Sequence, residues 1–219
     1  MEKKKIAVVL AGCGVMDGSE IHEAVTAMLA IEQQGGQYHC FAPQGEQSAV
    51  MNHATHQPAN EIRRMPAEAA RIARGDISLL SSFKASDYDA ILFPGGMGAV
   101  LNLCDFARRG KDCSVNPDVE RVVKEMHAAG KPIVALCIAP VLIARILGDV
   151  TVTIGNDPET CLAIKAMGGT PEICSAAQVC VDRKNKIIST PCYMLDKSLK
   201  EVAQSTSNAV RDLMDMLNR

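Results

Sequence analysis

The sequence lacks any segment that would cross a bilayer as a helix. No run approaches the ~20 consecutive apolar residues that a membrane-spanning helix needs. The 219 residues also carry a formal net charge of only −2, so the chain has no strong field to attract nucleic acid or an anionic membrane. The lysine cluster at residues 3–5 is typical of a solvated end. We therefore expect neither nucleic acid nor a membrane as a partner.

Paired cysteine motifs are also missing, although the chain contains nine cysteines. Their number is odd and no CxxC spacing occurs, which argues against a disulfide framework or a zinc ribbon. Reduced thiols predict a cytoplasmic location. The segment Leu10–Cys13 behind a lysine-rich start resembles a lipoprotein cleavage site. However, the apolar residues between Lys5 and Cys13 barely reach the minimum length of a signal sequence, and we reject that interpretation.

No linker rich in serine, glycine or proline divides the chain, so we expect a single domain over residues 1–219. Short apolar runs are typical of buried parallel strands. They occupy residues 6–10, 38–42, 90–93 and 133–136. Segments with helical spacing lie between and after them, at residues 21–34, 117–129 and 141–147. This alternation predicts an α/β fold.

The remaining segments predict an insertion and an irregular end to the sheet. Residues 43–85 are too long for a short crossover, so we expect an insertion with a helix at 66–74 and a short strand at 77–80. Its polar loop carries His53 and His56, which could bind a metal only if helical, and no third ligand is near, so no metal is expected. We expect the insertion to roof the active site. Further elements are expected at residues 150–154 (strand), 157–168 (helix), 179–181 with 186–189 (antiparallel pair) and 195–217 (helix).

The segment Lys131–Pro140 reads as a buried strand that stops at Cys137 and turns directly into a helix. Small residues, Ala135 and Ala139, flank the cysteine at two positions on either side. Such an elbow holds a nucleophile out of the sheet, and the amides at the start of the following helix favour a thiolate. The alternative is that Cys137 is one more small buried residue.

Two other features follow strands that should end near Cys137. Glu20 is expected in the first turn of a helix that Asp17 or Ser19 caps, beside the carboxyl end of a strand, where α/β sheets bind ligands. It could equally complement only the helix dipole. The adjacent glycines Gly95 and Gly96 allow backbone amides to approach the same crevice, although Gly-Gly alone is usually an ordinary loop.

These motifs together resemble the DJ/PfpI superfamily of class I glutamine-amidotransferase-like folds, and within it the bacterial enhancing-lycopene-biosynthesis family, described as glyoxalases. The residues that carry the resemblance are 12–23, 94–96, 137–140 and 190–195. It implies a flavodoxin-like sandwich, with a mostly parallel sheet between two layers of helices, and a homodimer. It also implies that Cys137 is the nucleophile, that Glu20 is the acid/base group, and that the amides near Gly95, Gly96 and Ile138 bind an oxyanion.

One expected residue is absent. Many members of the superfamily place a histidine after the next strand, but here Ile154–Asp157 occupies that region and no histidine follows His127. This counts against glutamine hydrolysis and peptidase activity, and predicts a slow enzyme. His22 lies two residues from Glu20 and should point to another helix face, so Tyr193 is the better candidate for a polar contact.

We therefore expect a cofactor-independent glyoxalase of low turnover. It would convert glyoxal to glycolate, and methylglyoxal more slowly to lactate, through a hemithioacetal on Cys137. Apparent deglycation of proteins or nucleotides could follow from the same aldehyde chemistry. The alternative is a non-enzymatic redox sensor or stress-linked binding protein that uses an oxidisable Cys137. A regulatory role in isoprenoid synthesis, which the family name suggests, has no support at the level of residues.

Overall fold

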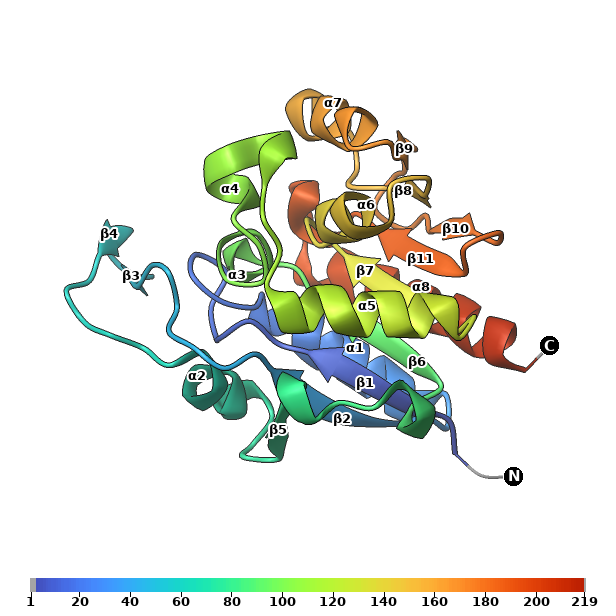
Figure 1. Ribbon diagram of the computed structural model, residues 1–219, viewed down its shortest axis with the longest axis horizontal. Helices are drawn as coiled ribbons and strands as arrows, with labels where there is room; N and C mark the ends of the chain where they lie inside the picture. Colours follow the sequence, from blue (N-terminus) through green and yellow to red (C-terminus); the bar gives the residue numbers. More distant parts are fainter. Residues whose placement is uncertain (1–2, 219) are drawn as a thin grey trace.

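The computed structural model describes residues 3–218 and has a seven-stranded sheet at its centre (Figure 1). The strand order is β10-β11-β7-β6-β1-β2-β5, and every neighbouring pair is parallel except β10 with β11. The strands are β1 (Lys5–Val9), β2 (Gln37–Ala42), β5 (Ile77–Leu79), β6 (Ala90–Phe93), β7 (Ile133–Leu136), β10 (Cys180–Asp182) and β11 (Ile187–Thr190). The predicted α/β fold and its antiparallel edge are confirmed.

Helices cover both faces of the sheet because its strands are apolar on both sides. Alternate residues of β1 point to opposite faces, so Ala7 and Val9 join one core while Ile6 and Val8 join the other. The first core is closed by α3 (Met97–Leu101), α5 (Pro117–Ala128) and α6 (Pro140–Leu147). The second is closed by α1 (Ile21–Gln33), α2 (Met65–Ile72) and α8 (Leu199–Leu217), with α1 and α8 behind the sheet in Figure 1.

Two predicted elements differ from the structure. The strand expected at residues 150–154 shortens to β8 (Thr151–Val152), which pairs with β9 (Thr170–Pro171) outside the central sheet. The last helix begins at Leu199 rather than Leu195, because Ser198 and Glu201 form a capping box at its start. The short η4 (Cys192–Met194) precedes it. The first difference reflects pairing of β8 with β9 outside the central sheet, and the second reflects the capping box. Hydrophobic periodicity reports neither.

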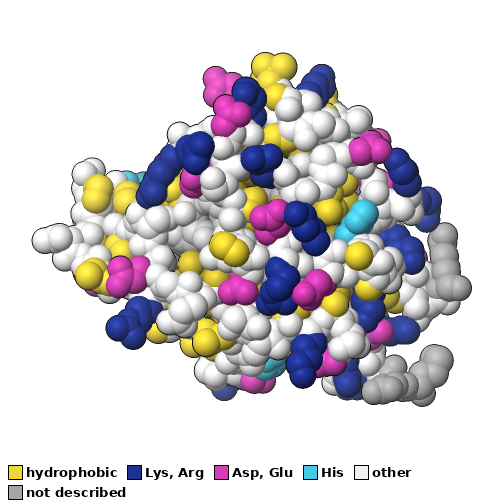
Figure 2. Space-filling model, viewed as in Figure 1, with side chains coloured by type: hydrophobic (Ala, Val, Ile, Leu, Met, Phe, Trp, Pro, Cys, Tyr) yellow, Lys and Arg dark blue, Asp and Glu magenta, His cyan; other side chains and the backbone are white. Residues whose placement is uncertain are grey.

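The remaining elements are short. They are β3 (Met51–Asn52), β4 (Gln57–Pro58), η1 (Leu80–Ser82), η2 (Ala85–Asp87), α4 (Phe106–Arg109), η3 (Gly110–Asp112) and α7 (Pro158–Ala166). Within residues 3–218, no helix combines the length and the apolar character required to span a membrane. On the face drawn in Figure 2, basic and acidic side chains are interspersed. This distribution agrees with the small net charge of the chain.

Candidate active site

Cys137 occupies the sharp turn between β7 and α6. Its φ of +58° lies in the left-handed region, which costs a non-glycine residue about 1 to 3 kcal/mol. The surrounding backbone holds this conformation, because the Cys137 amide donates to the Thr190 carbonyl at 2.9 Å and the Ala139 amide donates to the Leu136 carbonyl at 2.9 Å. The predicted strand-turn-helix elbow at Cys137 is confirmed.

Two backbone amides point at the Cys137 sulfur, those of Gly96 and Ile138. Gly96 has a φ of +90°, and a Cβ atom there would lie 2.4 Å from the Glu20 nitrogen. A Cβ atom on Gly95 would lie 2.4 Å from the Cys137 Cβ. Only glycines therefore permit this close approach. The arrangement places two hydrogen-bond donors where a negative charge on sulfur, or on an oxygen bound near it, would develop.

The carboxyl group that contacts the thiol belongs to Glu23. The Cys137 sulfur and Glu23 Oε2 border the same point beside Gly95, and each group shifts the pKa of the other. Glu23 is fully buried, and its Oε2 accepts from the Gly95 amide at 2.9 Å while its Oε1 accepts from the Tyr193 amide at 3.2 Å. We expected Glu20 beside the thiol, and the structure places Glu23 there instead, one helical turn further along α1.

Glu20 is the N-cap of α1 and not a residue of its first turn. Its backbone is extended (φ −66°, ψ 119°), and its Oε2 accepts from the Glu23 amide at 2.7 Å. The predicted caps serve other groups: Ser19 Oγ accepts from the Ala11 amide at 2.8 Å, and Asp17 Oδ2 accepts from the Met51 amide at 2.7 Å. Glu20 nevertheless remains close to the site, because its charge raises the pKa of Glu23.

The capping role of Glu20 also changes the position of His22. The prediction that His22 points to another face of the helix than Glu20 requires both residues to be helical. Glu20 has an extended backbone, so helical spacing does not set the angle between the two side chains. His22 Nδ1 lies 3.0 Å from the Tyr193 hydroxyl and 3.8 Å from Glu20 Oε1. Tyr193 belongs to η4, so the residues before α8 and the start of α1 meet beside Cys137.

A neutral thiol and a carboxyl that titrates near neutral pH form the centre of the site. Burial, followed by the negative charge of Glu20, raises the pKa of Glu23 to about 7. Burial, followed by the charge of Glu23, raises the pKa of the Cys137 thiol well above its usual range, and the Gly96 and Ile138 amides oppose that rise. With the thiol pKa above that of the carboxyl, the resting pair keeps its proton on sulfur, and Glu23 is the neighbouring group that can accept it.

The buried Glu23 has a measurable consequence for stability. Its pKa in the folded state lies above the ordinary glutamate value of 4.5, so the stability gained from protonated Glu23 is fully present below pH 4.5 and is lost as pH rises through about 7. We expect the unfolding free energy of the wild type, relative to Glu23→Gln, to fall by about 3 kcal/mol over that range. Urea unfolding of both proteins at about pH 4.5 and about pH 8 measures this difference. A difference that is the same at both pH values would contradict it.

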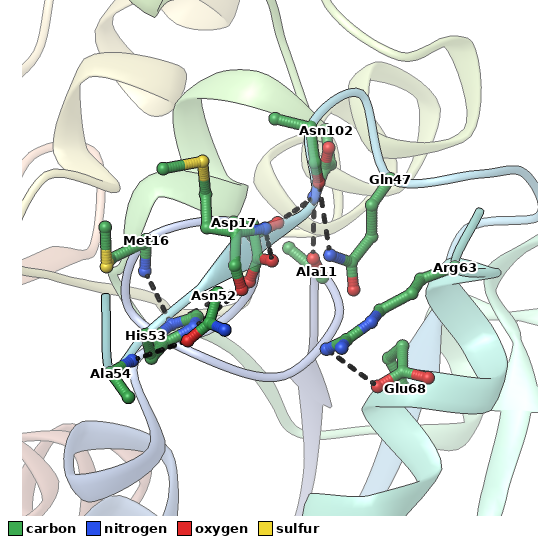
Figure 3. Close-up of polar contacts among 12 residues, drawn as sticks. Ala11, Met16, Asp17, Gln47, Asn52, His53, Ala54, Arg63, Glu68 and Asn102 are labelled. Atoms are coloured by element: carbon green, nitrogen blue, oxygen red, sulfur yellow. Dashed lines mark hydrogen bonds and ion pairs between the residues drawn. The ribbon is translucent and has the colours of Figure 1, made fainter. Parts of the chain in front are cut away.

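The insertion supports the loop that leads to Glu20 (Figure 3). The Met16 amide donates to His53 Nε2 at 3.1 Å, and the Met51 amide donates to Asp17. Asn102 Nδ2, at the end of α3, donates to the Asp17 carbonyl at 2.8 Å. His53 is therefore used as a hydrogen-bond acceptor. Among residues 3–218, no cluster of three or more His, Cys, Asp or Glu side chains is placed to hold a metal.

The polar part of the insertion, residues 46–60, contacts the loop of residues 12–18, Asn102 at the end of α3 and Arg108 in α4, and its β3–β4 hairpin extends away from the sheet (Figure 1). The expected roof above Cys137 is therefore a buttress for this loop. Cys137 itself is only 7% exposed, so the confinement of the site comes from the elbow and its immediate neighbours.

Known proteins resemble this chain along most of its length. The human glutamine amidotransferase-like class 1 domain-containing protein 3, mitochondrial, is 42% identical over 225 residues, covering 98% of this chain and 84% of that protein. The rat ES1 protein homolog, mitochondrial, is 40% identical over 227 residues, covering 99% and 85%. The chain belongs to the ES1 family of class 1 glutamine-amidotransferase-like proteins. No family model matches it.

Solved structures agree with membership of the ES1 family. An isoprenoid biosynthesis protein with an amidotransferase-like domain from Ehrlichia chaffeensis has a TM-score of 0.93 and 34% identity, covering 98% of this chain and 99% of that chain. Drosophila melanogaster DJ-1beta has a TM-score of 0.58 and 15% identity, covering 100% and 92%, which shows the fold alone. The predicted resemblance to class I glutamine-amidotransferase-like proteins is confirmed, and the match to DJ-1beta shows that the fold is shared with that protein.

The relatives in the ES1 family overturn the predicted location. The human, rat and zebrafish proteins are all named as mitochondrial, which contradicts the cytoplasmic prediction. That prediction depended on reduced cysteines alone. Reduced thiols exclude an oxidising compartment, but they do not distinguish one reducing compartment from another.

Proposed function

We propose that this protein is a cofactor-independent glyoxalase that converts glyoxal to glycolate. The observation that carries the proposal is the contact between the Cys137 thiol and the Glu23 carboxyl, with the Gly96 and Ile138 amides directed at the same sulfur. Such a site combines a nucleophile, a proton acceptor and a place for an oxyanion within one confined region.

The reaction would begin with transfer of the thiol proton to Glu23 and attack of the sulfur on one aldehyde carbon. The new alkoxide takes up a proton to give a hemithioacetal. A base then removes the C–H proton from that carbon, and the neighbouring carbon is protonated, which leaves a thioester on Cys137. Water attacks the thioester, the thiol is regenerated and glycolate leaves. The sum is one glyoxal plus one water, so no external oxidant is needed.

Glutamine hydrolysis is the alternative that the family name suggests. A Cys-His pair would require a histidine after β8, yet Ile154–Asp157 occupies that position and no histidine follows His127. A redox sensor is a weaker alternative because it depends on a readily ionised thiol. Here burial and Glu23 raise the pKa of Cys137.

We expect glyoxal to be processed faster than methylglyoxal. The Cys137 residue is 7% exposed, so an added methyl group would crowd the proton transfer, and it also makes one carbonyl less electrophilic. One methyl group is worth ~1 to 3 kcal/mol in such a pocket, which predicts a graded preference in kcat/KM. Faster turnover of methylglyoxal, or of bulky glycated peptides, would show that the site is open.

The proposal is tested with purified protein and with glyoxal, methylglyoxal and glutamine as separate substrates. NMR identifies glycolate and lactate, and ammonia release reports glutamine hydrolysis. We expect glycolate from glyoxal and no ammonia from glutamine. Ammonia without glycolate would reject the glyoxalase in favour of a glutaminase. The proposal extends to a homodimer, for which sedimentation is the direct measurement, and to the mitochondrial setting that the names of the relatives support.

A further inference from the structure

Glu20, His22 and Tyr193 form a polar chain at the edge of the Cys137 site. His22 Nδ1 lies 3.0 Å from the Tyr193 hydroxyl and 3.8 Å from Glu20 Oε1. The two rings are tilted at 47°, with centroids 6.0 Å apart. The Tyr193 backbone amide donates to Glu23 Oε1, so the residue whose hydroxyl contacts His22 also contacts, through its backbone, the carboxyl beside the thiol.

The exposure of the side chains rises from the buried site toward water. Glu23 is fully buried, and the side chain of Glu20 is 9% exposed, whereas the side chain of His22 is 52% exposed. Hydrolysis of a thioester on Cys137 needs a proton to leave the attacking water and another to reach the sulfur. A buried carboxyl performs only one of these transfers at a time, and it needs a route by which protons exchange with solvent.

We infer that His22 carries protons between solvent and the Cys137 site through the Tyr193 hydroxyl, in place of the histidine that is absent after β8. This inference rests on the proposed glyoxalase function. A neutral imidazole accepts a proton on one nitrogen and releases one from the other. When the Tyr193 hydroxyl gives its proton to the alkoxide of the adduct on Cys137, Nδ1 of His22 donates a proton to the tyrosine oxygen and Nε2 takes one from water. One proton enters the chain and one leaves it.

The charged and titratable neighbours of His22 suit this role. Glu20 faces it from the N-cap of α1, with Oε1 3.8 Å from His22 Nδ1. Tyr193 faces it from η4, and Glu23 lies behind both. A hydroxyl of Thr26 donates to the His22 carbonyl and so fixes the backbone of the first turn of α1.

A purely structural role would give His22 the same hydrogen bond, so the test must separate positioning from proton transfer. In His22→Asn, the amide replaces Nδ1 and keeps a partner for Tyr193, but it carries no proton across the side chain. In His22→Ala, added imidazole can occupy the space of the half-exposed ring. The control is His56→Asn, in the insertion, because His56 is exposed and its φ of +58° is one that asparagine tolerates.

The experiment measures kcat and KM with glyoxal for the wild type and these three variants, with and without imidazole. We expect His22→Asn to lower kcat about 10²-fold with KM within about twofold. We expect imidazole to restore His22→Ala at least about tenfold, and more basic imidazoles to restore it more. The wild type and His56→Asn should not respond. Adding Tyr193→Phe should abolish the rescue, because the hydroxyl that connects the ring to the site is then missing.

Three outcomes would overturn the inference. An active wild type with an equally active His22→Asn would reject proton transfer by His22 and leave the glyoxalase proposal intact. A slow His22→Asn without rescue of a folded His22→Ala would show that His22 only positions Tyr193. An inactive wild type would reject the glyoxalase function and the inference with it. Thermal unfolding of each variant excludes loss of the fold as the cause.

Discussion

Replacing Cys137 with serine is expected to lower glyoxal consumption by about 10³-fold or more. The hydroxyl is a weaker nucleophile than the thiol at neutral pH, and Glu23 would have to remove a far less acidic proton. The fold should survive, because serine has almost the same size and the elbow is held by backbone hydrogen bonds to Thr190 and Leu136. Steady-state rates and thermal unfolding, measured on the same samples, test both statements.

The matched control is Cys161→Ser. Cys161 lies in α7 and is only partly buried, so the same change there removes a thiol without touching the elbow. We expect this variant to retain wild-type activity. Equal losses in both variants would mean that serine acts on folding and would remove Cys137 from the mechanism.

The second large effect is expected at Glu23. Glu23→Gln should lower kcat by about 10²- to 10⁴-fold, because an amide cannot take the thiol proton. Its single oxygen also accepts from only one of the Gly95 and Tyr193 amides, whereas the two carboxylate oxygens accept from both. KM should change little. Glu20→Gln keeps an N-cap acceptor for the Glu23 amide and does not contact the sulfur, so its loss should be smaller by at least about tenfold. Kinetics of the two variants under identical conditions make the comparison.

A larger loss of kcat in Glu20→Gln than in Glu23→Gln would restore Glu20 as the acid/base group and contradict the assignment to Glu23. A Glu23→Gln variant that forms a stable hemithioacetal but releases no glycolate would narrow the role of Glu23 to part of the reaction. In that case the thiol reacts without the carboxylate, and Glu23 acts only on the later proton transfers.

The sequence was sufficient for the sheet and for the elbow because their signals are local. Apolar runs such as Ile133–Leu136 end at glycine, proline or a small residue, and each corresponds to a strand of the central sheet. The turn at Cys137 follows from the small residues around it and from Pro140. Hydrophobic periodicity failed at β8, where two residues pair outside the main sheet, and at α8, where a capping box sets the first residue.

The missed carboxyl had a signal in the sequence. Glu23 precedes Ala27 by four residues and Ile31 by eight, which places it on the buried face of α1. A carboxylate on such a face requires partners, and the elbow cysteine and the Gly95 amide are those partners. The family resemblance assigns the acid/base role to Glu20, which instead caps α1. A helical Glu20 would also turn His22 away from the site, whereas the extended cap lets His22 contact Tyr193.

The most direct measurement follows doubly ¹³C-labelled glyoxal by NMR with the wild type and with Glu23→Gln. We expect the wild type to produce labelled glycolate as the only product, over many turnovers and without any added cofactor. We expect Glu23→Gln to produce little or none in the same time. Labelled glyoxal that persists with the wild type, or equal glycolate formation by both proteins, would contradict a Cys137–Glu23 glyoxalase.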